Sequence, residues 1–348
     1  MNTKPLTPFD HPAAWTAEEL MAQTDKWIYE LTAEDLAELD AAHREIKSRG
    51  LVAPFFGKDD FSIPKLAATI EDHRDELEFG LGIFNVVGFP IEKYTKDETS
   101  AIFWGIGSYF GPGWPQNAVG HLISDIRNTG DDLSNPDIRG YQTSAELDLH
   151  TDGADILGLV CLRKAKEGGE NQIVSAVAAL NKLIEIDPDA AEHLLNTTLY
   201  LDWRGEEGPG EKPYYAAKLY TETPKGVTCL SILPYVYSAQ ERFEDIPRLS
   251  EKDLAALEAF EKAKWDESLV VRVLQEPGNL LFLNNHYLLH ARSSFVDHEK
   301  PDEKRHLRRL WLESQAWGDA RPAAMDTILN TVRKHWDTGV GIEMWDNE

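Results

Sequence analysis

The segment HTDGADILGLVCL, residues 150–162, carries the clearest fold signal, because a polar start leads directly into an apolar, β-branched run. Similar short runs recur through the rest of the chain, separated by turn-rich segments: NQIVSA (171–176), YYAAKLY (214–220), GVTCLSI (226–232), SLVVRVL (268–274), GNLLFLN (278–284) and HLRRLWL (306–312). Many short strands with irregular connections are typical of an antiparallel sandwich or jelly roll and not of alternating βαβ units. We therefore predict a mainly β fold.

Helical patterns flank and interrupt these runs. Thr16 with Glu19 and Thr32 with Asp35 are N-cap signals within a helical stretch over 16–79. Further helical patterns at 176–196, 250–264 and 322–335 read as decorations on the sheet. We predict a helical N-terminal lead-in at 1–80, packed on a jelly-roll core with helical insertions at 81–348, the whole forming a single structural domain.

The composition excludes several classes of protein. The 348 residues include 35 basic and 60 acidic residues, a net charge of −25, and 42% are hydrophobic, which is enough for a sizeable core. A surface this acidic repels phosphate backbones and anionic lipids, so we expect no nucleic-acid or membrane partner. Two isolated cysteines and the lack of a long apolar run indicate a soluble, cytoplasmic protein. The sequence does not indicate an oligomeric state.

Four His-x-Asp/Glu triplets are candidates for metal binding, at residues 43–45, 73–75, 150–152 and 335–337. In a chain this acidic, such triplets also arise by chance. Three of them lie in helical patterns, where residues i and i+2 point about 200° apart and cannot hold one ion together. His150 and Asp152 differ, because they lie where a strand runs into a loop and can share one face.

A third ligand should come from a distant strand. The segment PGNLLFLNNHYLLHARSSF, residues 277–295, provides His286 and His290 just beyond an apolar run, and either could instead be structural. Two histidines and one carboxylate leave three positions of an iron open, as in non-haem Fe(II) oxygenases. Structural zinc prefers a closed shell rich in cysteine or histidine, which this chain cannot readily provide.

An oxygenase of this type needs two extra electrons from a co-substrate. A dicarboxylate donor would call for an arginine, because a guanidinium matches a carboxylate in a bidentate manner and stays charged. In the predicted strand KRHLRRLWLE, residues 304–313, the period places Arg305, Leu307 and Arg309 on one face and His306 and Arg308 on the other. The alternative is an exposed basic strand that pairs with the acidic surface.

Together these segments resemble the iron(II)- and 2-oxoglutarate-dependent dioxygenases of the taurine dioxygenase-like family, which includes clavaminate synthase and γ-butyrobetaine hydroxylase. The resemblance covers roughly residues 80–315 and rests on the ordered set HTD (150–152), GGEN (168–171), PGNLLFLNN (277–285), LHAR (289–292) and RHLRRLWL (305–312). It implies a double-stranded β-helix, the jelly roll of this family.

The resemblance also implies roles for single residues. His150, Asp152 and His290 match the iron ligands, which makes His286 the weaker candidate. Arg305 matches the arginine that binds the distal carboxylate of 2-oxoglutarate, and Arg309 matches a position near co-substrate or substrate. Asn171 stands where relatives often have a threonine that contacts 2-oxoglutarate; an asparagine there is a departure, although its amide can still donate to a carboxylate.

The implied activity uses O2 and 2-oxoglutarate to oxidise an unactivated C–H bond of a small molecule, with release of succinate and CO2. Hydroxylation, desaturation and cyclisation all remain open. Gln116, Asn117 and Tyr141 are candidate substrate contacts, or residues with ordinary loop hydrogen bonds. A small amino acid or related acid would suit Arg309. Two alternatives stay open: an iron oxidase that needs no 2-oxoglutarate, and a jelly-roll binding protein without turnover.

Overall fold

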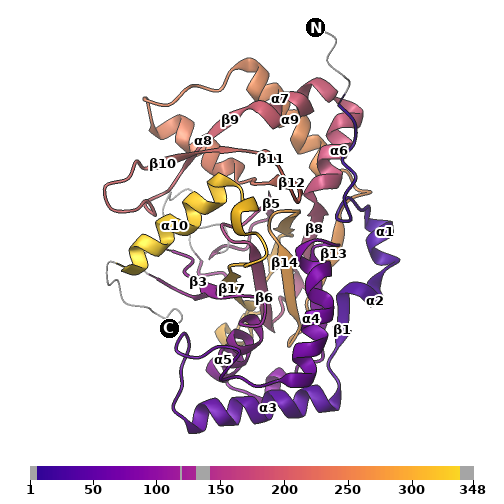
Figure 1. Cartoon of the computed structure of the whole chain (residues 1–348), viewed down its shortest axis with the longest axis vertical. Helices are drawn as coiled ribbons and strands as arrows, with labels where there is room; N and C mark the ends of the chain where they lie inside the picture. The colour runs from indigo at the N-terminus through magenta and orange to yellow at the C-terminus, as the bar shows by residue number, and fades with distance from the viewer. Residues whose placement is uncertain (1–5, 118–119, 131–141, 338–348) are drawn as a thin grey trace.

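The computed structural model describes residues 6–117, 120–130 and 142–337 of the chain. Strands occupy the middle of the molecule, and helices gather at its two ends (Figure 1). Helices α3 and α5 lie at one end, and α6, α7 and α9 lie at the opposite end.

Helices begin where the capping signals predict them. Thr16 and Thr32 each form a capping box with the acidic residue three positions later, and Thr95 does the same at α5. The helices are α1 (Ala17–Met21), α2 (Thr24–Trp27), α3 (Ala33–Ser48), α4 (Pro64–Glu78), α5 (Lys96–Gly107), α6 (Ala176–Ile186), α7 (Pro188–Asn196), α8 (Leu233–Arg242), α9 (Glu251–Lys264) and α10 (Ala323–Asp337).

The larger sheet contains seven strands in the order β1-β2-β14-β6-β17-β3, with β4 also paired to β17. Its bounds are β1 (Ile28–Glu30), β2 (Ile83–Val87), β14 (Leu280–Asn284), β6 (Ile156–Arg163), β17 (His306–Leu312), β3 (Gly113–Trp114) and β4 (Ile123–Ile126). The run 154–162 forms β6, which lies between β14 and β17 and is antiparallel to both. Because β6 is a central strand, nearly all of its residues are buried.

The smaller sheet contains four strands in the order β13-β8-β15-β5. They are β13 (Val271–Val273), β8 (Asn171–Ser175), β15 (Leu288–Arg292) and β5 (Leu147–His150). The register places His290 opposite His150 across β15 and β5, and Arg292 opposite Asn171 across β15 and β8. Segments far apart in the sequence therefore meet on this sheet.

Three two-stranded ribbons complete the described strands. They are β9 (Thr198–Asp202) with β10 (Tyr214–Lys218), β11 (Tyr220–Thr223) with β12 (Gly226–Cys229), and β7 (Glu167–Gly168) with β16 (Phe295–Val296).

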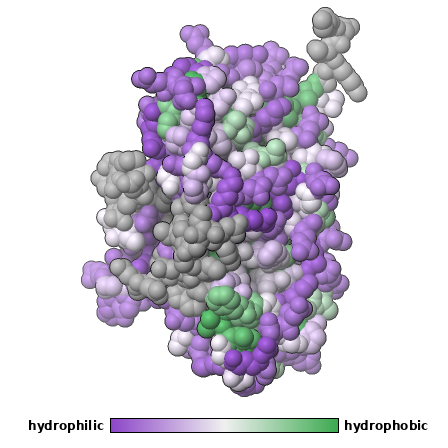
Figure 2. Space-filling model, turned by 60° about the vertical axis from the view of Figure 1, so that its left-hand side comes forward, coloured by the Kyte–Doolittle hydropathy of each residue, from purple (hydrophilic) through white to green (hydrophobic). Residues whose placement is uncertain are grey.

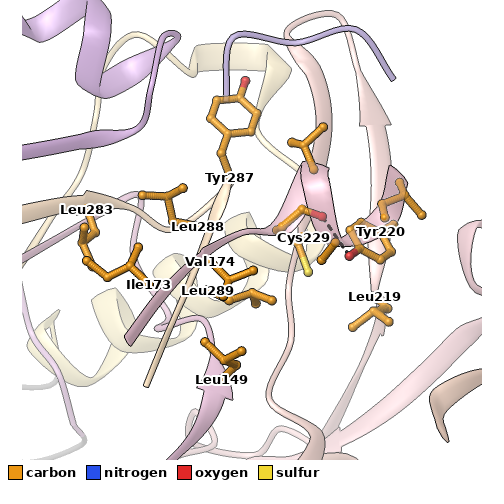
Figure 3. Close-up of a cluster of buried hydrophobic side chains, with 14 of the residues drawn as sticks. Leu149, Ile173, Val174, Leu219, Tyr220, Cys229, Leu283, Tyr287, Leu288 and Leu289 are labelled. Carbon is orange, nitrogen blue, oxygen red and sulfur yellow. Dashed lines mark hydrogen bonds between the residues drawn. The ribbon is translucent and has the colours of Figure 1, made fainter. Parts of the chain in front are cut away.

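Residues of both sheets belong to one hydrophobic core. Figure 3 shows part of it, in which Leu149, Ile173 and Leu289 of the smaller sheet lie near Leu283 of the larger one. Tyr287 and Leu288 belong to the same cluster. The apolar residues of the two sheets thus fix how the sheets pack against each other.

The predicted mainly β fold is confirmed only in part, because the described chain is a mixture of helices and sheets. Helices account for ten elements, including α8, which the sequence reading did not identify. Its segment LPYVYSAQER begins with a proline at the first turn and buries Leu233, Val236 and Ala239 on one face. In the sequence, its short length and flanking polar residues resemble a loop.

The N-terminal lead-in contains a strand as well as helices. Its short strand β1 pairs in parallel with β2 and so joins the larger sheet. The division at residue 80 stays a prediction. The face drawn in Figure 2 is largely hydrophilic, as expected for a chain with this charge, and carries a hydrophobic patch near its lower end. Among the described residues, we find no helix with the length and apolar character needed to cross a bilayer.

Candidate metal centre

A cavity of about 950 Å³ lies between the two sheets. The strands that carry the predicted functional side chains all contribute residues to its wall. Both sheets contribute to its wall, through Leu157, Leu159, Leu307 and Trp311 on one side and His150, Asn171, His290 and Arg292 on the other. A cavity of this size suits a small ligand or two.

His150, Asp152 and His290 converge at this cavity. His150 ends β5, Asp152 follows in the next loop, and His290 lies within β15. The two imidazole ring centroids are 4.3 Å apart, and His290 Nε2 lies 3.9 Å from Asp152 Oδ2. Potential ligand atoms of all three lie within 4.8 Å of one another, and the described residues contain no other such group of histidine, cysteine and carboxylate side chains.

His150 is held in the tautomer that leaves Nε2 available. Its Nδ1–H donates to the carbonyl oxygen of Asp148 at 2.8 Å. The Asp148 carboxylate in turn accepts hydrogen bonds from Lys264 Nζ at 2.7 Å and Trp265 Nε1 at 3.0 Å. Helix α9 therefore fixes the strand end that orients this imidazole, as outer partners of metal ligands commonly do.

Asp152 is held from three directions. Its backbone N–H donates to Asn285 Oδ1 at 3.2 Å, and Trp311 Nε1 donates to its Oδ2 at 3.0 Å. Arg309 Nη1 lies 3.2 and 3.1 Å from its two oxygens. Burial alone would raise the pKa of Asp152, but the charge of Arg309 and the nearby histidines lower it overall. The carboxylate is therefore ionised.

His290 is neutral in this environment. Burial first, and then His150, lower its pKa to about 3. A neutral imidazole has a free lone pair and is the form that binds a metal ion. Two histidines beside one carboxylate give the donor set predicted from the sequence.

The alternation predicted for HLRRLWL is confirmed. Arg305, Leu307 and Arg309 line the cavity. On the opposite face, His306 Nε2 and Arg308 Nε contact Asp125 Oδ1 at 2.8 and 2.9 Å. This face packs under α5, where Arg308 also donates to Ser100. The strand is therefore a buried element with two different polar faces, not an exposed basic strand.

Arg305 is buried, with 3% of its surface exposed, and its Nη1 has no hydrogen-bond partner among the described residues. Its Nη2 lies 3.4 Å from the carbonyl oxygen of Gly169, and its guanidinium carbon lies 5.2 Å from the centroid of the Phe295 ring. Burial lowers its pKa to about 10, which leaves it charged near neutral pH.

In the GGEN segment, Gly169 leaves space for the Arg305 side chain. Gly169 has a φ of 78°, and a β-carbon at this position would lie 3.0 Å from Arg305 Nε. A glycine accepts the left-handed conformation and also leaves the space that the guanidinium fills. The adjoining N–H groups of Gly169 and Glu170 donate to Ser293 Oγ at 3.0 and 3.1 Å, which ties this loop to the end of β15.

The model of the family described as "Taurine catabolism dioxygenase TauD, TfdA family" matches residues 47–311. The chain belongs to the TauD, TfdA family. This membership confirms the resemblance predicted from the sequence. The family match begins within the predicted lead-in and ends in β17, so it includes the three converging residues and Arg305.

This member of the TauD, TfdA family can be aligned with known proteins over most of its length. FR-33289 synthase of Streptomyces rubellomurinus (strain ATCC 31215) is 29% identical over 308 residues, which are 87% of this chain and 89% of that protein. Asparagine oxygenase in complex with Fe(II), 2S,3S-3-hydroxyasparagine and succinate has a TM-score of 0.63 at 12% identity, covering 82% and 93% of the two chains.

A further solved structure has the same fold. The non-heme iron oxygenase OrfP in complex with Fe and alpha-ketoglutaric acid has a TM-score of 0.58 at 17% identity, covering 83% of this chain and 94% of its own. At such low identities, the likeness shows that the chain folds as these oxygenases do.

The remaining predicted residues fall into three groups. Gln116 and Asn117 line the cavity; Gln116 Oε1 accepts from Arg309 Nε at 2.7 Å, whereas Asn117 bonds to His121. Asn171 also lines the cavity, and its amide donates to Gln275 Oε1 at 2.8 Å. Tyr141 lies outside the described residues.

His286 does not join the converging residues. Its Nε2 lies 2.8 Å from Asp155 Oδ1, and its ring lies against Trp317 with a centroid separation of 3.8 Å. Sequence reasoning did not identify Trp311 or Arg292, although the period of two from Arg309 and from His290 points to both. It also missed that His290 lies within a strand, because LLHAR follows directly on the turn after β14.

Proposed function

We propose that the chain is a non-haem oxygenase that uses Fe(II) and 2-oxoglutarate to oxidise an unactivated C–H bond of a small molecule. One observation carries this proposal: two histidines and one carboxylate converge on the same cavity that a buried arginine lines. Membership of a dioxygenase family supports the enzyme class, and the proposed double-stranded β-helix would bring the two sheets around this cavity.

The donor set fits iron. Two imidazoles and one carboxylate on one side of an ion leave open positions on the other, which is typical of Fe(II) oxygenases. His150, Asp152 and His290 would hold the ion, and Asp148 and Trp311 would orient two of these ligands. Trp311 engages Oδ2 of Asp152, which favours binding of the metal through the carboxylate's remaining lone pairs.

The cavity also fits a dicarboxylate. Arg305 would bind the distal carboxylate, because its buried Nη1 lacks an acceptor in the part of the chain that the structure describes and a guanidinium matches a carboxylate. With both groups bound, the pair would supply the oxidising chemistry together with O2: one oxygen atom would enter the dicarboxylate, giving succinate and CO2, and the other would oxidise the substrate. Asn171 would contribute less than predicted, since its amide already has Gln275 as an acceptor. A bound α-ketoglutaric acid in OrfP supports this assignment.

The substrate we propose is an amino acid or related small acid. Arg309 would hold its carboxylate beside the metal, and Gln116 would hold Arg309 in place through its bond to Nε. Glu146 and Glu206 line the same cavity and would suit an ammonium group. Among the structural neighbours, the asparagine oxygenase complex contains a hydroxylated amino acid, which supports this class.

The test is a screen of amino acids and related acids for substrate-dependent succinate formation, with each product examined by mass spectrometry. We expect a gain of one oxygen atom or a loss of two hydrogen atoms in one compound, and no succinate without it. Product formation that does not require 2-oxoglutarate would favour the iron oxidase. Tight ligand binding with no product from any compound that binds would favour a binding protein.

A further inference from the structure

Arg292 is a second deeply buried arginine of the cavity. It lies two residues after His290 on β15, so both side chains project from the same face of that strand. Only 3% of its surface is exposed, and it lines the cavity together with His290 and Arg305. Its register partner on β8 is Asn171. The strand therefore presents a metal ligand and then a cation in the same direction.

Arg292 and Arg305 share one aromatic neighbour. Their guanidinium carbons lie 4.7 and 5.2 Å from the centroid of the Phe295 ring. Arg292 Nη2 donates to the carbonyl oxygen of Ala145, but its Nε and Nη1 have no hydrogen-bond partner among the described residues, and neither does Nη1 of Arg305. Two guanidinium groups thus leave several buried N–H donors for a ligand.

A purely structural arginine in this fold looks different. Arg321, which anchors the start of α10, donates from Nε and Nη2 to Asp155 at 3.1 and 2.8 Å, and from Nη1 to Asp326 at 3.3 Å. All of its nitrogen atoms have acceptors. Arg292 instead has a single acceptor among the described residues, although buried donors are nearly always satisfied in folded proteins.

The charges around Arg292 are also unbalanced. Asp297 is the carboxylate whose charge acts on both arginines, and its Oδ1 accepts the backbone N–H of Arg305 at 2.7 Å. One carboxylate beside two guanidinium groups leaves an excess positive charge. Because an uncompensated buried charge is costly, an anion should complete this cluster.

We propose that Arg292 and Arg305 together bind the distal carboxylate of 2-oxoglutarate, so that Arg292 is a second residue for binding this co-substrate. This inference rests on the proposed function and extends it to a residue outside the predicted set. The carboxylate of the primary substrate is the other possible anion, and binding measurements made without that substrate distinguish the two.

The experiment compares two oxo acids on the Fe(II)-loaded protein under anaerobic conditions, without primary substrate. Calorimetric titration with 2-oxoglutarate reports the whole co-substrate site. Titration with 2-oxopentanoate, which lacks the distal carboxylate, reports only the metal-proximal half. In Arg292→Gln we expect the affinity for 2-oxoglutarate to fall about tenfold to a hundredfold, because hydrogen bonds to a charged group are lost. The affinity for 2-oxopentanoate should stay within about twofold.

Two further variants keep this test decisive. Arg292→Lys retains the charge but not the planar fork, so it should lose less affinity for 2-oxoglutarate than Arg292→Gln; it also replaces that variant if the latter does not fold. Arg163→Gln is the matched control, since Arg163 lies on β6 and bonds outside the cavity to Lys304 and His306. It should bind both oxo acids as the wild type does.

The inference fails if Arg292→Gln, or Arg292→Lys in its place, binds 2-oxoglutarate as tightly as the wild type. It also fails if both oxo acids weaken equally, because that result would show a general structural role. A wild-type protein that binds neither acid would instead contradict the proposed function, so the two failures are distinguishable.

Discussion

Arg309 donates from Nη1 to both carboxylate oxygens of Asp152, at 3.2 and 3.1 Å, so the arginine proposed for the substrate touches the proposed metal ligand. Substrate binding and the metal centre are therefore linked through one side chain. If the substrate carboxylate also binds Arg309, it is placed next to the ion, where a C–H bond must lie to be oxidised.

We expect Arg309→Ala to raise the substrate KM at least tenfold and to lower the affinity for Fe(II). Trp311→Phe is its control, because it removes the bond from Nε1 to Asp152 Oδ2 while keeping Arg309 and an aromatic ring at this position, and it should lower Fe(II) affinity about tenfold to a hundredfold. Steady-state kinetics and metal titrations measure both. If the two variants change metal affinity alike and neither changes KM, Arg309 acts only through Asp152.

The two histidines of NNHYLLH should respond oppositely. His290→Ala should abolish stoichiometric Fe(II) binding while leaving the fold intact, because no described residue forms a hydrogen bond with Nδ1 of His290. His286→Ala should retain the metal but lower the unfolding temperature, since it removes the bond to buried Asp155 and the contact with Trp317. Metal content and thermal unfolding measure these two effects. Loss of the metal in His286→Ala but not in His290→Ala would overturn the ligand assignment.

Gly169→Ala should weaken 2-oxoglutarate binding, because the new β-carbon would press on Arg305 Nε. Gly210→Ala is the matched control: its φ of 77° is nearly that of Gly169 at 78°, but a β-carbon there meets no atom of the described residues within 4 Å. Both variants should lose about 1–2 kcal/mol of stability from the left-handed backbone. Equal co-substrate affinity in the two variants would show that the glycine serves only the turn.

The buried cluster of Asp125, His306 and Arg308, on the face of β17 that lies away from the cavity, should make the protein less stable in acid. Burial raises the pKa of Asp125, but its bond to His306 and the charge of Arg308 lower it overall, below its ordinary value of 3.8. A lowered carboxyl pKa contributes stability above the unfolded pKa and loses it as the pH falls toward the folded pKa. The free energy of unfolding should therefore decrease below about pH 4.

Asp125→Asn should remove this acid limb and cost about 3–5 kcal/mol at neutral pH, because buried Arg308 loses its ion-pair partner and His306 loses a hydrogen bond. Glu258→Gln, which breaks only the exposed pair with Lys262, should leave stability nearly unchanged. Denaturant titrations across the pH range give both values. An unchanged acid limb in Asp125→Asn would show that other carboxylates cause it.

Local patterns predicted the parts of the site that depend on the strand period. The alternation in HLRRLWL was enough to separate Arg305 and Arg309 from His306 and Arg308, and helical periodicity removed the other triplets. The residues alone left His286 and His290 open, because the choice depends on where the chain turns between β14 and β15. Asp155 and Trp317, which contact the His286 side chain, are distant from it in the sequence.

Other features follow from tertiary contacts that no local pattern encodes. Arg292 looks like an ordinary charged residue at a strand end until Phe295 and Arg305 are seen beside it. The sequence leaves open whether Asn171 contacts a ligand; the side chain lines the cavity, but its amide also donates to Gln275 on a neighbouring segment. The balance of helix and strand was also misjudged, since α8 owes its burial to packing against β9.

The most direct test of the central claim is anaerobic addition of Fe(II) and 2-oxoglutarate to the wild-type protein, followed by visible absorption. Chelation of iron by the oxo acid produces a weak charge-transfer band, which we expect in the wild type. The band should be lost in His150→Ala and weakened in Arg305→Ala at the same co-substrate concentration. A wild-type protein that binds Fe(II) but develops no band would contradict the account.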